Sequence, residues 1–174
     1  MVNQYKNDVI VLVGMSGVGK STIGKALSER MGIAFLDVDE LITSKLQMSI
    51  NDFFIAKGED AFRVLERQCI LGLKGITKTV IATGGGALIS PNVMDHLLQV
   101  GTVIYLEIQS DALASRLNGE QGQRPMVKDL NEEELKLRLS DLLDQRASAY
   151  KLADFTIDAA ASINVVLASI LTKV

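Results

Sequence analysis

The 174-residue sequence has one cysteine, one histidine and no long apolar run, so it lacks the features of disulfide-rich proteins, of Cys- or His-ligated metal sites and of membrane-spanning proteins. Its single cysteine, Cys69, excludes a disulfide framework, and we expect this thiol to be buried in the core. Its single histidine, His96, falls in a predicted short helix, which argues against metal ligation. No apolar run approaches the length of a membrane span, and the N-terminus lacks the apolar core of a signal peptide. We therefore expect a globular, cytoplasmic protein with no membrane partner.

A strong charge of either sign is also absent. The formal net charge at pH 7 is −3, which argues against a general nucleic-acid-binding protein. Hydrophobic residues make up 48% of the chain, so a folded core is expected rather than disorder. Because the length suits one domain and no linker or internal repeat interrupts it, we expect a single domain over residues 1–174.

What the sequence does contain is a glycine-rich segment, GMSGVGKST at residues 14–22, directly after the apolar run 9–13. It matches the phosphate-binding loop, in which glycines let backbone N–H groups turn toward phosphate oxygens. Lys20 would reach the β- and γ-phosphates, Ser21 would ligate Mg²⁺, and the following helix would direct its positive end at the anion. The residues expected to bind ATP here are Gly14, Ser16, Gly17, Val18, Gly19, Lys20, Ser21 and Thr22. The alternative is a glycine-rich turn with no ligand.

Short apolar runs alternate with helical patterns, which predicts βαβ units and a parallel sheet with helices on both faces. The expected strands are 9–13, 34–36, 79–82, 102–106 and 155–157. The expected helices are 20–31, 40–47, 50–57, 59–74, one from Ser90-Pro91 to 100, one at 110–117, one from Asn131 to about 149, and a last one that closes the chain.

Polar residues follow the second and third predicted strands, where ligands bind in open parallel sheets. In extended chain, the two-residue spacing of Asp37 and Asp39 would point both carboxylates the same way, one near Mg²⁺ and one near an acceptor hydroxyl. The alternative is a solvated acidic turn that caps the next helix. Glycines 84–86 follow the third strand in place of an Asp-x-x-Gly switch, and no guanine-reading Asn-Lys-x-Asp run occurs. The pattern therefore favours a kinase over a GTPase.

Three arginines are candidates for binding anions. Arg124 lies in the polar, glycine-containing segment 118–130 between two helices, where a mobile lid could close over a triphosphate and exclude water. Arg63 and Arg146 lie in predicted helices, where isolated arginines are usually surface residues.

The motifs, taken in chain order, resemble the shikimate kinase family. The matching segments are GMSGVGKSTIGKALS, FLDVDELI, SINDFF with GEDAFRVLE, TGGGAL, RPM and QRASAYKLADFTID. The resemblance spans nearly the whole chain and implies a three-layer P-loop fold of the nucleoside monophosphate kinase type, with strand order 2-3-1-4-5. It also implies ATP-dependent phosphorylation of the 3-hydroxyl of shikimate, on the route to chorismate and aromatic amino acids, by an enzyme that is commonly a monomer.

The resemblance also implies roles for individual residues. Catalysis is implied for Lys20, Asp39 and Arg124. Shikimate binding is implied for Asp39, Arg63, Gly84, Gly85, Gly86 and Arg146, with the helical segment 38–66 as the acceptor-binding part. The magnesium shell is implied for Ser21 and Asp37. Arg116 would stack on adenine, Arg124 would reach the phosphates from a lid at 118–130, and Glu66 would orient Arg63.

Two other readings of the sequence stay open at this point. A gluconate kinase has a similar phosphate loop and an acidic end of the second strand. A catalytically inactive nucleotide-binding regulator would also keep the loop, although the presence of Lys20, Asp39 and Arg124 speaks against it.

Overall fold

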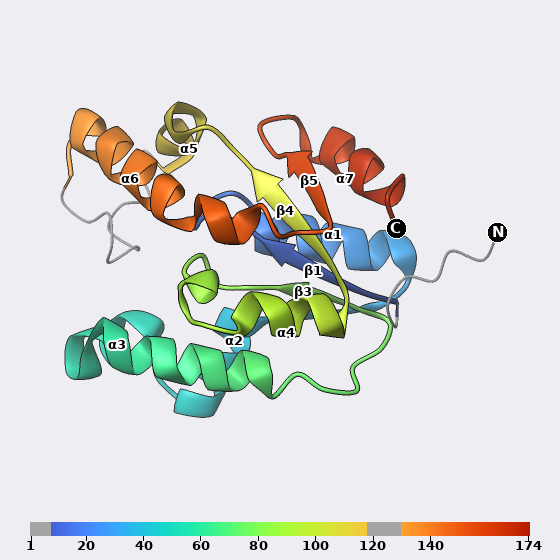
Figure 1. Ribbon diagram of the computed structural model, residues 1–174, viewed down its shortest axis with the longest axis horizontal. Helices are drawn as coiled ribbons and strands as arrows, with labels where there is room; N and C mark the ends of the chain where they lie inside the picture. The colour runs from blue at the N-terminus through green and yellow to red at the C-terminus, as the bar shows by residue number, and fades with distance from the viewer. Residues whose placement is uncertain (1–7, 118–129) are drawn as a thin grey trace.

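The computed structural model describes residues 8–117 and 130–174. Five strands in these segments form one parallel sheet in the order β2-β3-β1-β4-β5 (Figure 1). The strands are β1 (Val9–Val13), β2 (Ala34–Asp37), β3 (Thr79–Ala82), β4 (Thr102–Glu107) and β5 (Phe155–Asp158). The predicted strands, their parallel pairing and the predicted order are confirmed.

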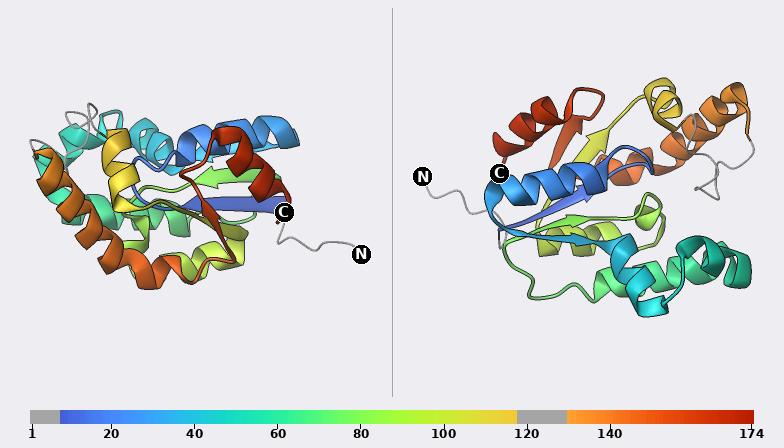
Figure 2. Two further views of the ribbon diagram at one scale, coloured as in Figure 1. Left: turned by 90° about the horizontal axis from the view of Figure 1, so that it is seen from above. Right: turned by 180° about the vertical axis from the view of Figure 1, so that it is seen from behind.

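The sheet lies between two layers of helices (Figure 2). Helices α1 (Lys20–Met31) and α7 (Ile163–Leu171) cover one face, and α4 (Val93–Val100) and α6 (Glu132–Tyr150) lie on the other. All five residues of β1 are buried, because the central strand of such a sheet is covered from both sides. Its run of uninterrupted aliphatic residues, without polar alternation, is the sequence signature of that position.

Several predicted helix ends are confirmed by their capping contacts. Helix α1 ends at Gly32, whose left-handed conformation lets its N–H reach the carbonyl groups of the last turn. Helix α6 begins with a capping box, in which Asn131 and Glu134 each accept the other's backbone N–H at 3.0 and 2.8 Å. At the start of α3 (Ile50–Leu71), the Ser49 hydroxyl accepts the N–H of Asp52.

Three boundaries differ from the prediction. Helix α2 (Val38–Leu46) begins directly after β2, because Asp37 caps it, so Asp39 lies in a helical turn rather than in extended chain. The helices predicted at 50–57 and 59–74 are the two parts of α3, which the non-helical Gly58 separates as expected, and the second part ends earlier than predicted, at Leu71. The helix predicted to start at Ser90-Pro91 is α4, which begins at Val93 after a short 3-10 helix and is preceded by Asn92 in a left-handed conformation.

The single cysteine and the single histidine each contact another residue of the fold. Cys69 is 5% exposed, as expected for a core thiol, and Lys45 Nζ lies 3.8 Å from its sulfur. His96 Nε2 lies 3.2 Å from the Leu73 carbonyl oxygen. Within residues 8–117 and 130–174, no group of three His, Cys, Asp or Glu side chains is arranged to hold a metal ion.

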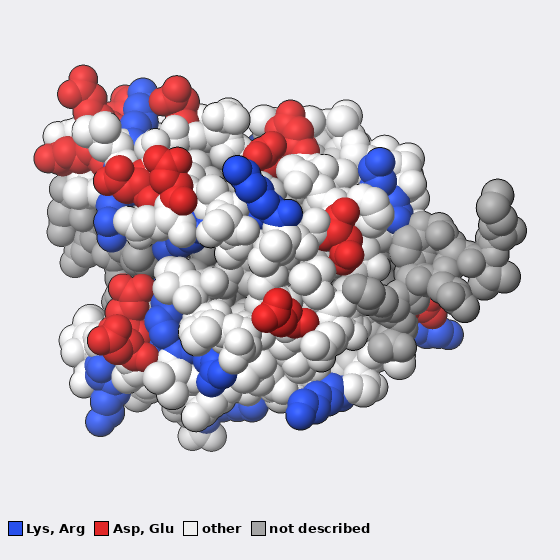
Figure 3. Space-filling model, viewed as in Figure 1, with Lys and Arg blue, Asp and Glu red and all other residues white. Residues whose placement is uncertain are grey.

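Charged side chains are mixed over the face seen in Figure 3, and acidic ones gather over α5 (Ser110–Leu117) and α6. On this face the Lys and Arg side chains are separated by acidic and uncharged ones. Among the helices of the described segments, none combines the length and the hydrophobicity that crossing a membrane requires.

Candidate active site

The loop between β1 and α1 presents backbone N–H groups at the start of a helix. Gly19 immediately precedes α1 in a left-handed conformation, with φ 103°, which a residue with a Cβ rarely adopts. Among the described residues, no side-chain cap is formed at this N-cap position, which is a glycine. The positive end of α1 and its N–H groups are therefore open to an anion at the edge of the sheet, as the loop motif predicted.

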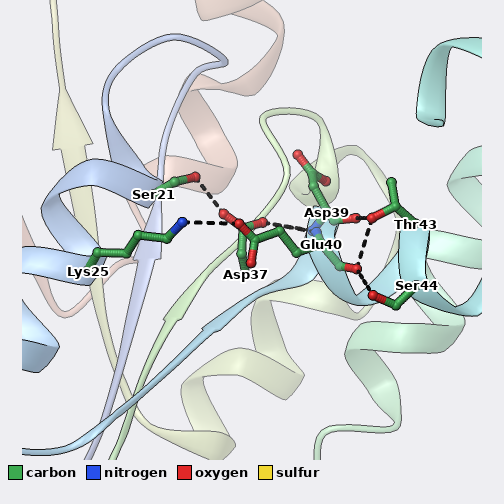
Figure 4. Close-up of polar contacts among 7 residues, drawn as sticks. All are labelled: Ser21, Lys25, Asp37, Asp39, Glu40, Thr43 and Ser44. Carbon is green, nitrogen blue, oxygen red and sulfur yellow. Dashed lines mark hydrogen bonds and ion pairs between the residues drawn. The ribbon is translucent and has the colours of Figure 1, made fainter.

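Lys20 and Ser21 lie at the same helix start and have defined partners. The Lys20 ammonium donates to the carbonyl oxygens of Gly14 and Met15, each at 2.8 Å, and the side chain is 7% exposed. The Ser21 hydroxyl donates to Asp37 Oδ2 at 2.5 Å (Figure 4). A hydroxyl and a carboxylate at a phosphate loop are hard oxygen ligands of the kind that Mg²⁺ takes together with phosphate oxygens and water. This pair fits the predicted magnesium position.

The predicted common direction of Asp37 and Asp39 is wrong. Asp37 Oδ1 accepts the backbone N–H groups of Asp39 and Glu40, at 2.9 and 3.4 Å, while Oδ2 faces Ser21. Because α2 starts at Val38, successive residues rotate around the helix axis and the Asp39 side chain points elsewhere (Figure 4). The structure divides the two carboxylates between two sites, one at the phosphate loop and one at a neighbouring cavity.

That cavity has a volume of about 290 Å³ and gathers residues from six parts of the chain. Its polar lining comprises Ser16, Asp39, Asn51, Arg63, Glu66, Gly84, Gly85, Gly86 and Arg146. Its apolar lining comprises Met15, Ile50, Phe54, Phe62, Leu117, Leu139 and Leu142. All the residues expected to bind an acceptor therefore line one cavity, and the phosphate loop forms part of its wall.

Arg63 enters this cavity from α3 between two carboxylates. Its Nη1 donates to Glu66 Oε2 at 2.7 Å, and its Nη2 and Nε donate to Glu59 Oε1 at 2.9 and 3.2 Å. Burial works to lower the pKa of Arg63, but the charges and hydrogen bonds of Glu66 and Glu59 outweigh it and raise that pKa. The predicted contact between Glu66 and Arg63 is confirmed.

Glu66 is itself 1% exposed, and burial raises its pKa despite the nearby Arg63. Its second oxygen, Oε1, is buried and has no hydrogen-bond partner among the described residues. This oxygen is directed at Gly84, where a Cβ would collide with it and would lie 3.0 Å from Asp39 Oδ1. The glycine therefore leaves room for two acidic side chains at one wall of the cavity.

Arg146 enters the cavity from α6 and is 4% exposed. Its Nη1 donates to the Gly85 carbonyl oxygen at 3.0 Å and to the Met15 sulfur at 3.4 Å. Its Nε and Nη2 are buried and have no partner within the described part of the chain. Buried, unpaired guanidinium donors are costly in free energy, so a cavity that keeps them is suited to an anionic ligand that supplies the missing acceptors.

Arg116 lies at a second cavity, of about 330 Å³, which also borders the phosphate loop. Its Nη1 donates to Val18 O at 3.1 Å, and its Nη2 donates to Ala159 O and Ala160 O at 2.6 and 3.3 Å. The arginine thus joins the phosphate loop to the segment after β5. Its stacking on adenine stays a prediction. Arg124, together with residues 118–129 of the predicted lid, lies outside the described residues.

Two residues at this site were not identified from the sequence. Met15 contacts Arg146 through its sulfur, and Tyr150 donates its hydroxyl to Gly85 O at 3.3 Å. Tyr150 carried a usable signal, because it lies four residues after Arg146, on the same face of the predicted helix. Met15 carried none, since its position in the loop pattern accepts any residue.

The chain matches one protein family along most of its length. A model of the family described as shikimate kinase matches residues 16–174. The shikimate kinase of Geobacter sulfurreducens is 42% identical over 151 residues, which are 87% of this chain and 81% of that protein. A shikimate kinase structure from Bacteroides thetaiotaomicron has a TM-score of 0.88 at 28% identity, covering 95% of this chain and 98% of that one. One from Acinetobacter baumannii, solved in complex with shikimate, has a TM-score of 0.83 at 33% identity, covering 95% and 93%.

A gluconokinase structure from Sinorhizobium meliloti 1021 is a more distant match. Its TM-score is 0.56 at 18% identity, over 97% of this chain and 92% of that one. A similarity at this level of identity concerns the fold alone. The gluconate kinase alternative is therefore not favoured over the family that the sequence resembles.

Proposed function

Because the chain belongs to the shikimate kinase family, we propose that it transfers the γ-phosphoryl group of ATP to the 3-hydroxyl of shikimate. The product, shikimate 3-phosphate, would enter the synthesis of chorismate and aromatic amino acids. The observation that carries the proposal is Arg146, which lines the same cavity as Asp39 and Arg63 and whose buried Nε and Nη2 have no hydrogen-bond partner among the described residues. Two guanidinium groups and a carboxylate suit an acceptor that carries both a carboxylate and hydroxyl groups.

The acceptor carboxylate would bind between Arg63 and Arg146. A guanidinium offers two parallel N–H groups that match the two oxygens of a carboxylate. Arg63 donates hydrogen bonds to Glu66 and Glu59, and Arg146 donates to Gly85 O and the Met15 sulfur. Both guanidinium groups are therefore oriented before the acceptor binds. Such preorganisation reduces the entropy lost on binding.

Asp39 would accept the hydrogen bond of the reacting hydroxyl and orient it for in-line attack, taking its proton as the phosphoryl group transfers. The cavity is lined by Asp39 and by residues of the phosphate loop, which supports a position of this carboxylate beside the proposed donor site. Gly84, Gly85 and Gly86 would offer backbone contacts to the acceptor. Side chains at these three positions would collide with Glu66, Ser16 and Arg63.

On the donor side, the amides of the loop 14–22 and Lys20 would hold the β- and γ-phosphates. Ser21 and Asp37 would hold Mg²⁺, which neutralises charge on the transferring phosphoryl group when it is bound. We further assign Arg116 to the adenine site, Arg124 to the phosphates, residues 118–130 to a lid, and 38–66 to acceptor binding within one domain over 1–174. A monomer in the cytoplasm, without nucleic-acid or membrane partners, is the expected state.

An acceptor panel tests this function directly. Purified protein with Mg-ATP should release ADP on addition of shikimate, and very little with gluconate or AMP, measured by coupled ADP detection. Equal turnover with all three acceptors, or none with shikimate, would contradict the assignment. Binding of ATP without turnover of any acceptor would instead support an inactive nucleotide-binding protein.

Substitution of Asp39 tests the proposed role of this carboxylate. Asp39→Asn should lower kcat by about 10²–10⁴-fold, the usual contribution of a positioned acid–base group, while ATP still binds. Steady-state kinetics and nucleotide titration measure the two effects separately. Asp52→Asn, at an exposed position on α3, is the matched control. A kcat near that of the wild type would show that Asp39 does not orient the hydroxyl.

A further inference from the structure

One carbonyl group in the glycine run receives two side chains from α6. Gly85 O accepts Arg146 Nη1 at 3.0 Å and the Tyr150 hydroxyl at 3.3 Å. The two donors lie one helical turn apart on α6, while Gly85 follows β3. Arg146 lines the cavity, whereas Tyr150 lies behind it and is only 2% exposed. Tyr150 can therefore affect an acceptor only through the groups that it contacts.

Fixing the Gly85 carbonyl also fixes the next backbone N–H. In a trans peptide, the C=O of one residue and the N–H of the next point in opposite directions. Since Gly85 O is directed at α6, the Gly86 N–H is directed away from α6. Gly86 lines the cavity, and no residue in the described segments accepts a hydrogen bond from its N–H. This N–H is therefore an oriented donor available to a ligand.

The peptide between Gly85 and Gly86 needs such a constraint. Glycine has more backbone conformations available than any other residue, so a peptide between two glycines can rotate at low cost. Arg146 alone would hold the carbonyl with a nitrogen that also contacts Met15. The Tyr150 hydroxyl adds a second donor from a different side chain.

The ring of Tyr150 packs against a second aromatic ring. It stacks on Tyr105 of β4, with centroids 4.4 Å apart and planes 8° from parallel. Burial raises the pKa of Tyr150 to about 12, with the positive charge of Arg146 acting in the opposite direction. The hydroxyl consequently stays protonated, and able to donate, at every pH at which the protein would be assayed.

We propose that Tyr150 is a positioning residue for the acceptor site: together with Arg146 it holds the Gly85 carbonyl, so that the Gly86 N–H is presented to the bound acceptor. This inference rests on the proposed function, since the acceptor is taken to be shikimate. It assigns to Tyr150 a contribution to acceptor affinity and none to nucleotide binding.

The two stacked tyrosines provide a matched pair of variants. Tyr150→Phe removes the hydroxyl that reaches Gly85 and keeps the stacked ring. Tyr105→Phe removes the other hydroxyl, which makes no hydrogen bond in the described part of the structure, and also keeps the stack. Steady-state kinetics with shikimate and ATP, combined with thermal unfolding, are measured for both variants and the wild type.

Tyr150→Phe should raise KM for shikimate about three- to tenfold, as expected from loss of one hydrogen bond, with kcat and KM for ATP within twofold of the wild type. Tyr105→Phe should leave all three constants within twofold. An unchanged KM for shikimate in Tyr150→Phe would overturn the inference, even if its Tm fell. Equal rises in both variants, or an equal rise in KM for ATP, would also overturn it. Absence of wild-type turnover with shikimate would contradict the proposed function instead.

Discussion

Glu66 shows how a single buried residue can combine two opposing effects. It is 1% exposed, and one of its oxygens pairs with Arg63 while the other has no partner in the described segments. Burial raises its pKa, and the neighbouring Arg63 lowers it less than burial raises it. The carboxylate thus holds an arginine of the acceptor site at a cost in folding free energy, since burying an ionised group is unfavourable.

Because burial raises the pKa of Glu66, we predict that the stability of Glu66→Gln relative to the wild type depends on pH. The pKa of Glu66 in the folded protein lies above the ordinary value of 4.5, so the folded state binds the proton more tightly than the unfolded state. The contribution of Glu66 to stability therefore falls as the pH rises from about 4.5 through the folded-state pKa. The variant lacks this loss, so its Tm relative to the wild type should increase with pH across that window. Differential scanning calorimetry from pH 4.5 upward measures the difference.

The matched control is Glu59→Gln. Glu59 is the other carboxylate on Arg63, but its side chain is 43% exposed, so the burial that causes the trend is absent. Both variants remove one ion pair of the same arginine. A Tm difference for Glu66→Gln that stays flat or decreases with pH would show that the ion pair with Arg63 outweighs burial.

Among the helices and strands, α3 is interrupted by a kink at the glycine where the sequence predicted a break. Gly58 has φ 81° and ψ 172°, inside a segment that is otherwise helical. The predicted break at Gly58, with a second helix from residue 59, is confirmed by this conformation. The kink separates Ile50 and Phe54 from Phe62, Arg63 and Glu66, and both halves contribute lining to the cavity proposed to bind the acceptor.

The backbone of Gly58 predicts the effect of a substitution there. Its φ and ψ lie in a region that only glycine adopts readily, so Gly58→Asn should lower the free energy of unfolding by about 1–3 kcal/mol. In a chain of this size that corresponds to roughly 2–4 °C in Tm for each kcal/mol. Thermal unfolding followed by circular dichroism measures the change.

Gly32→Asn is the control for this substitution. Gly32 and Gly58 both have positive φ and open space where a Cβ would lie, so a steric clash explains neither effect. Gly32, however, is in the left-handed helical region, with φ 66° and ψ 34°, which asparagine tolerates. Equal losses at the two positions would contradict the role assigned to the conformation of Gly58.

At the scale of the whole molecule, one hydrophobic core connects both layers of helices to the sheet. Tyr105 and Tyr150 join β4 to α6 across this core, and the sequence contains no tryptophan. Two of the three tyrosines form this pair, so a change in tyrosine fluorescence includes the loss of packing between β4 and α6, while far-ultraviolet circular dichroism reports on the helices generally. The two signals sample different parts of the same fold.

We predict that denaturant unfolding monitored by these two signals gives coincident transitions, because a single core unfolds cooperatively. Mg-ATP at about 100 times its Kd should increase the unfolding free energy by about 2.7 kcal/mol, since only the folded loop binds it. Free Mg²⁺ and AMP at the same concentrations are the controls. A tyrosine transition at lower denaturant would show that α6 detaches before the rest, contrary to a single cooperative domain.

The phosphate loop, the five parallel strands and most helix ends could be predicted from the sequence alone. These features depend on local patterns: glycine spacing at 14–19, aliphatic runs as in β1, and capping residues such as Asn131 with Glu134. The strand order and the roles of residues came from a resemblance to a family, and the matches along the chain support that resemblance.

Which functional groups face one another could not be predicted from local sequence patterns and follows from how the chain folds. The tertiary structure separated Asp37 from Asp39, because α2 starts one residue after β2 ends. It paired Arg146 with Gly85 and Met15, which lie 61 and 131 residues away in the chain, and set Tyr150 behind them. Such pairings depend on how α6 packs against the ends of β1 and β3, and no local pattern in the sequence encodes that distance or direction.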